Sequence, residues 1–136
     1  MTLLDFSIYW AAFVLAMIIL ANFIAPGKLG YAKNLAKVEP FFSEVFRVHC
    51  GYTVLTMLAM MLACIFYHDE LRDGVGLGFG VNLFLAVFWG SRVLVQLFFY
   101  NREIKHKYPV YNVIFFIAFL YLGVLFSFLT VRSLIG

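Results

Sequence analysis

The residue whose type and position most invite chemistry is Arg92, a charged residue inside a long apolar run. It lies about eight residues, or roughly 12 Å along a helix, from the nearer end of that run. A charge at such a depth in a bilayer costs about 2.5 kcal/mol or more unless it finds a partner or water. We expect Arg92 to face protein, where it either binds an anionic group or ties helices together.

Residues around Arg92 repeat at helical spacing. Asn82, Leu85, Trp89, Arg92 and Gln96 follow one another at steps of three and four, so they share one face of a helix. This face is the predicted polar seam of the bundle, with Asn82 and Trp89 as its structural members.

A second group of polar residues, Glu44, Arg47 and His49, stands at the start of another apolar run. With Arg92 and Gln96 they form the candidate site for a ligand or lipid. Arginines and a histidine outnumber any one carboxylate, so a lipid phosphate, a carboxylate or a thiolate is the natural guest. Taken singly, Glu44 and Arg47 fit anchoring at the membrane interface better.

Other polar residues could complete this site. Glu44 or Glu103 could neutralise Arg47 or Arg92, and hydrogen bonds could come from Thr53, Asn22 and Asn112. Haem is disfavoured because two axial histidines would both have to lie within the bundle, and only His49 does. We assign no cofactor.

The acidic stretch His68, Asp69 and Glu70, followed by Asp73, contains metal-ligand residue types. Consecutive residues on a helix point in different directions, so we expect a solvated loop and no metal site. The sequence also lacks a Ser/His/Asp arrangement, a Cys-x-x-Cys pair and a phosphate-binding loop in the right context. No catalytic residue can be assigned.

The elements that must position these residues are membrane-spanning helices. Apolar residues make up 65% of the chain and charged residues 12%, which a water-soluble domain could not accommodate. Continuous apolar runs of about 20 residues fit helices and not barrel strands. We predict an all-α polytopic membrane protein, a single domain of residues 1–136 that forms an antiparallel four-helix bundle with spans at about 6–25, 45–67, 78–100 and 110–131.

The connections between the apolar runs, and the residues at their ends, predict how the helices pack. The short link of residues 101–107 makes the third and fourth spans antiparallel neighbours. The fourth run has few polar side chains, so we expect it to face lipid or a larger partner. Alternating glycines from Gly74 to Gly80 suggest a flexible entry to the third span and close helix approach.

Basic residues predict the orientation. Six of them, Lys28, Lys33, Lys37, Arg102, Lys105 and Lys107, lie in the first and third connections, whereas the other side has only Arg72 and Arg132. The positive-inside rule places the two basic connections in the cytoplasm and both termini outside, in a plasma or inner membrane. The basic residues form no stripe, so nucleic acid is not an expected partner.

Two short stretches resemble the membrane-associated eicosanoid and glutathione metabolism (MAPEG) family. Arg47-Val48-His49 is similar to the Arg-Ala-His stretch of that family's second helix, and Ser91-Arg92-Val93-Leu94 with Tyr100 is similar to its third. The asparagine and glutamate that follow in the family fall here near Gly51 and Val54. The resemblance implies a comparable bundle with a cytoplasm-facing polar site and not glutathione chemistry.

These features predict a small non-catalytic subunit or accessory protein of a larger membrane complex. Its expected partners are membrane lipids and either other membrane subunits or further copies of itself. The alternative is a small enzyme or carrier for a lipid-soluble anionic substrate at the cytoplasmic leaflet, with Arg47 and Arg92 binding the anion and His49 moving a proton. An ion or solute channel is a weaker third interpretation, because a pore would require several copies.

Overall fold

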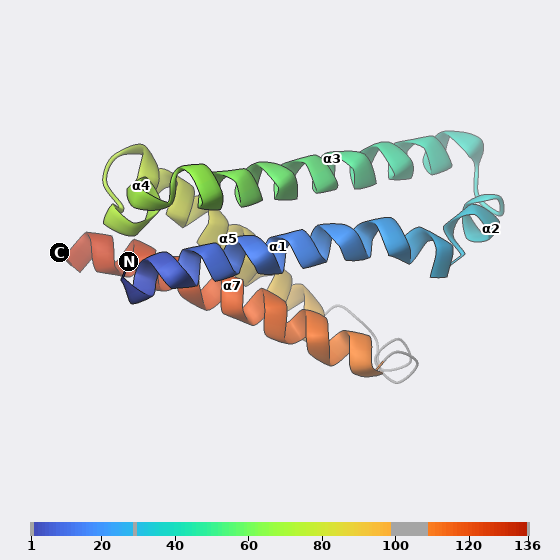
Figure 1. Cartoon of the computed structure of the whole chain (residues 1–136). Coiled ribbons are helices and arrows are strands. Elements are labelled where there is room, and N and C mark those ends of the chain that lie inside the picture. Colours follow the sequence, from blue (N-terminus) through green and yellow to red (C-terminus); the bar gives the residue numbers. More distant parts are fainter. Residues whose placement is uncertain (1, 29, 99–108, 136) are drawn as a thin grey trace.

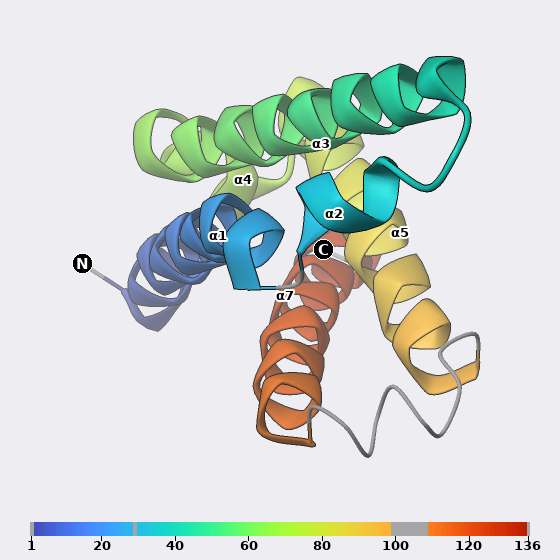
Figure 2. The same ribbon diagram turned by 90° about the vertical axis from the view of Figure 1, so that its right-hand side faces the viewer.

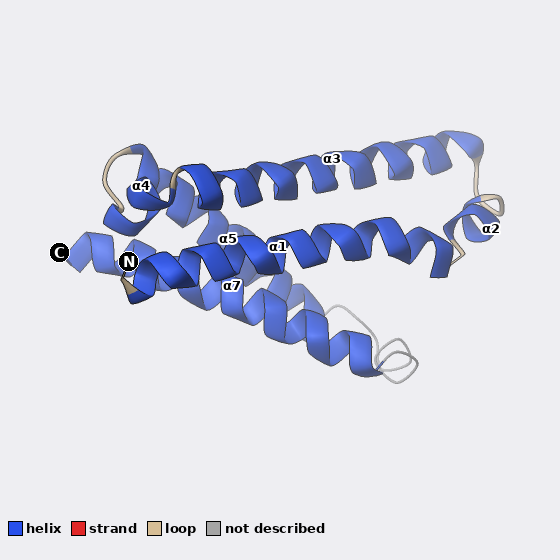
Figure 3. Ribbon diagram, in the orientation of Figure 1, coloured by secondary structure: helices blue, strands red, loops and turns tan. Residues whose placement is uncertain are grey.

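The computed structural model describes residues 2–28, 30–98 and 109–135. All regular structure in these ranges is helical, which confirms the predicted all-α class (Figure 3). Four helices are long and apolar enough to cross a membrane, so the chain is an integral membrane protein. These are α1 (Leu3–Lys28), α3 (Pro40–Phe66), α5 (Leu77–Phe98) and α7 (Pro109–Ile135), and two short helices join them, α2 (Tyr31–Leu35) and α4 (His68–Asp73).

Helix ends follow local sequence. Pro40 occupies the first turn of α3, where its missing N–H removes no helical hydrogen bond. Gly74 ends α4 in the left-handed conformation and donates its N–H to the carbonyl of Glu70. In α1 the helix runs beyond the predicted end at residue 25 and includes Pro26 in its last turn.

The four long helices form two antiparallel hairpins. Helix α1 packs along α3, and α5 packs along α7, while α4 contacts α1, α5 and α7 (Figure 1). The pairing of α5 with α7 confirms the expectation from the short connection. Both termini lie at the same end of the molecule as α4, which we name the α4 end (Figure 1). The opposite end, which carries α2, is named the α2 end.

The core is distributed unevenly along the bundle. Helix α7 contributes seven buried residues, among them Phe119, Leu122 and Phe126, so this side of the helix packs in the core. Other α7 residues, such as Ile117 and Val124, are exposed. In α3 the first buried residue is Met57. The first half of α3 therefore lies outside the core, and Figure 2 shows it well separated from α7 at the α2 end.

Candidate functional site

The α5 face identified by its spacing is buried in the structure. Asn82, Leu85, Trp89 and Gln96 are all buried. Asn82 donates a hydrogen bond of 2.8 Å from Nδ2 to the carbonyl oxygen of Leu71 in α4. Its Oδ1 and the indole Nε1 of Trp89 are buried without a hydrogen-bond partner in the described part of the chain. Asn82 thus joins α5 to α4.

Arg92 lies half-buried on the same helix and faces α7. Its guanidinium carbon is 4.9 Å from the centre of the Phe119 ring, within the range of a cation–π contact. One turn further, Gln96 donates from Nε2 to Oδ1 of Asn112. The polar end of α5 is therefore directed at α7 and joins these two helices.

The three α3 candidates are exposed. Glu44, Arg47 and His49 all lie on the part of α3 that is outside the core. Nδ1 of His49 is 2.9 Å from the carbonyl oxygen of Val45 and donates to it when that nitrogen carries the proton. Thr53 donates from Oγ1 to the carbonyl oxygen of His49, at 2.9 Å. His49 and Thr53 thus bond within their own helix.

The structure does not bring the two halves of the expected site together. Within residues 2–28, 30–98 and 109–135, no hydrogen bond or ion pair links Glu44, Arg47 or His49 to Arg92 or Gln96. Asn112 contacts Gln96, whereas Asn22 donates to Ile18 in its own helix. Glu103 lies outside the described residues. A single chain therefore presents an α5–α7 group and a separate α3 group.

A polar cluster at the α4 end is the feature that sequence reasoning missed. Asp5 of α1 is only 4% exposed, and Nη1 of Arg72 lies 2.7 Å from its Oδ1. Asp69 and Asp73 approach the same guanidinium at 3.2 and 3.3 Å. The expectation of a loop is wrong, because this stretch is the helix α4 with Leu71 buried beneath it, whereas Asp69, Glu70 and Asp73 are exposed as expected.

The surroundings of Arg72 and Asp5 explain why this pair can be stable. The hydrogen bond with Asp5, followed by that with Asp73, raises the pKa of the Arg72 guanidinium, which stays charged. Thr2 adds hydrogen bonds to the Asp5 carboxylate from its backbone N–H and its hydroxyl, each at 3.0 Å. The carboxylate is thus fully engaged, although it sits within an apolar helix.

The cluster also contains metal-ligand residues. One ligand atom each from Asp5, His68 and Asp69 lies within 4.8 Å of the others. However, the guanidinium of Arg72 already contacts both of these carboxylates, and the hydroxyl of Tyr9 lies 3.0 Å from Nδ1 of His68. The positive charge that a metal would supply here comes from Arg72, so we assign this cluster a structural role.

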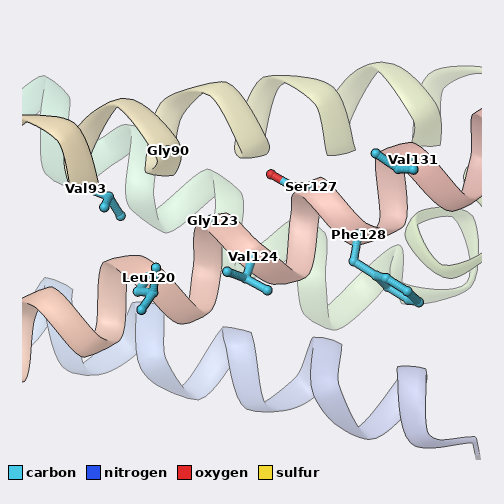
Figure 4. A pocket seen from close by; sticks show the side chains of 8 residues that line it. All are labelled: Gly90, Val93, Leu120, Gly123, Val124, Ser127, Phe128 and Val131. Atoms are coloured by element: carbon cyan, nitrogen blue, oxygen red, sulfur yellow. The ribbon is translucent and has the colours of Figure 1, made fainter.

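A depression on the described surface between α5 and α7 is apolar. It has a volume of about 510 Å³ and lies along α5 and α7, with Ser127 as its single side-chain hydroxyl (Figure 4). Close packing of the two helices forms its floor, because Gly90 and Gly123 lie against each other. None of its lining residues carries a charge. Its lining residues are Gly90, Val93, Leu120, Gly123, Val124, Ser127, Phe128 and Val131.

Comparison with known proteins adds no functional assignment. No model of a protein family matches the chain, and no curated protein or solved structure matches it. The resemblance of residues 47–49 and 91–94 to the MAPEG family thus stands on those residues alone.

Proposed function

We propose that this chain is a small non-catalytic subunit or accessory protein of a larger membrane complex. The observation that carries the proposal is the exposure of the first half of α3. No residue of this helix before Met57 is buried. Within this stretch Glu44 and Arg47 are exposed on a helix long and apolar enough to lie in a bilayer. Either residue alone could be anchored at the membrane interface. Together on one exposed helix they are better covered by side chains of a partner, because charges that face lipid are unfavourable.

Contacts of the other polar residues support a role without catalysis. Arg72 pairs with Asp5, Gln96 with Asn112, and Arg92 with the Phe119 ring, and each contact joins two helices. Two of these contacts lie within the α5–α7 hairpin, and the third joins α4 to α1. The alternative, an enzyme or carrier for a lipid-soluble anion, needs Arg47, His49 and Arg92 to converge on one substrate from helices that are not paired with each other.

Purification from the native membrane tests the proposal. The tagged chain is extracted in mild detergent, and co-eluting proteins, lipids and small molecules are identified by mass spectrometry. Protein partners in fixed stoichiometry, either other subunits or further copies of the chain, are expected. One specific anionic molecule in place of any partner, lost in Arg92→Leu and retained in the control Lys37→Leu, would favour the enzyme or carrier instead.

We also propose that the α2 end faces the cytoplasm of a plasma or inner membrane. Lys33 and Lys37 lie at this end, and the sequence between the end of α5 and the start of α7 holds three further basic residues, Arg102, Lys105 and Lys107. Positive residues are retained on the cytoplasmic side of membrane proteins. In a variant with Cys50→Ala, a cysteine at Val75 should react with an impermeant maleimide in intact cells, whereas one at Lys33 should react only after permeabilisation. The reverse pattern would contradict this orientation.

A further inference from the structure

The outer face of α3 carries a regular stripe that no other part of the described chain covers. Its positions, 44, 48, 51, 55, 58 and 62, alternate steps of four and three, which is the spacing of a helix that packs along a second helix. The side chains of Val48 and Leu55 are 54% and 56% exposed. Met57, Met60 and Cys64, which are buried, lie on the opposite face. Helix α3 thus has one face for its own chain and one free face.

A glycine stands in the middle of this stripe. A Cβ atom on Gly51 would meet nothing within 4 Å, so the residue makes room for nothing in its own chain. Small residues on membrane helices allow the backbone of another helix to approach closely, and association in lipid depends on such packing. The free face is therefore shaped for a helix.

Charges at the start of the stripe indicate which helix packs against this face of α3. Glu44 and Arg47 are exposed, and the described structure pairs neither of them in an ion pair. They are three residues apart, about 4.5 Å along the helix axis. If an identical α3 lies parallel to the first, Glu44 of each copy comes within side-chain reach of Arg47 of the other. A symmetric interface forms this contact twice, so that two Arg47 guanidiniums flank the two Glu44 carboxylates, which face each other across the axis.

We propose that α3 is the self-association helix of this protein and that its free face packs in parallel against α3 of a second copy. The stripe of Val48, Gly51, Leu55, Leu58 and Leu62 lies at the contact, and Glu44 and Arg47 form reciprocal ion pairs at its α2 end. Parallel packing is the arrangement that a shared membrane orientation requires. This inference rests on the proposed function, because it names the partner that covers the exposed half of α3.

Cysteine crosslinking in the membrane tests the contact. The full chain carries Cys50→Ala, while the fully buried Cys64 is kept. Leu55→Cys on this background should give a disulfide-linked species of twice the chain mass. The matched control is Val87→Cys on α5, because Val87 is 64% exposed and lies off the stripe. This variant should run at the mass of one chain. Equal crosslinking of both positions, or none at Leu55, would overturn the inference.

Charge reversal tests the ion pairs independently. Glu44→Arg and Arg47→Glu should each raise the dissociation constant of the self-associated form by about tenfold, the scale of two interhelical polar contacts in a membrane. The double reversal should restore association, and the control Lys37→Glu should have no effect. Failure of the double variant to recover, with both single variants folded, would reject the pairing.

The two proposals fail in different ways. A complex that contains other proteins and one copy of this chain would refute self-association and leave the subunit function intact. A chain that remains single and carries no protein partner would refute both.

Discussion

At the scale of single residues, Gly78 is the position least able to accept a side chain. A Cβ atom there would overlap the backbone carbonyl of Glu70, because α5 begins directly beneath α4. We expect Gly78→Ala to lower the free energy of unfolding by about 1–3 kcal/mol, the usual effect of overpacking. Thermal unfolding in detergent, followed by the fluorescence of buried Trp89, measures the loss.

Gly80 provides the control for this prediction, since a Cβ atom there meets nothing within 4 Å. Gly80→Ala should be neutral or should stabilise the chain by up to about 1 kcal/mol, because alanine restricts the unfolded state. Equal behaviour of the two variants would show that α4 does not rest on α5 as described.

Removal of the different carboxylates around Arg72 should lower the melting temperature by different amounts. Asp5→Asn leaves the guanidinium opposite a neutral amide at a buried position, so we expect a clear fall in melting temperature. Asp73→Asn removes a carboxylate whose side chain is 60% exposed, and its effect should be small. Melting curves that rank the two variants in the opposite order would contradict a structural role for Asp5.

At the scale of the elements, the hairpins are held together by few side chains, and Tyr121 is one of them. Its hydroxyl on α7 donates a hydrogen bond of 2.7 Å to the carbonyl oxygen of Ser7 on α1. Tyr121→Phe should lower stability by about 0.6 kcal/mol and by no more than about 1.7 kcal/mol, the range of such bonds in membranes. Chemical unfolding of both variants, with the exposed Tyr52→Phe as the control, measures the difference; a larger effect at Tyr52 would count against this contact.

Sequence patterns predicted the spans well because length and apolarity alone decide whether a helix can cross a bilayer. Helical spacing also identified the face of Asn82, Trp89 and Gln96. It could not reveal that Asp5 meets Arg72, since residues so distant along the chain are brought together only by the path of α4. Nor could it show that Arg92 faces α7 while Arg47 stays outside the core, because the periodicity of one helix does not say which neighbour it meets.

At the scale of the whole molecule, the two hairpins meet at the α4 end and separate toward the α2 end. Spin labels at Tyr67 and Leu134 should therefore lie closer together than labels at Phe42 and Val113, which lie on α3 and α7 near the α2 end and are both exposed. Pulsed electron resonance on Cys50→Ala variants measures both distances, and equal distances would show that the hairpins also associate at the α2 end.

The pairing of Asp5 with Arg72 has a consequence for how the protein is made. The two residues are separated by 67 positions along the chain. At synthesis rates of about 5–20 residues per second, the first helix exists for about 3 to 13 seconds before its counter-ion has been synthesised. During this interval Thr2 is the group in the structure that can already bond the carboxylate, because it lies in the same turn. Thr2 can thus bond the Asp5 carboxylate during the interval before α4, which carries Arg72, has been synthesised.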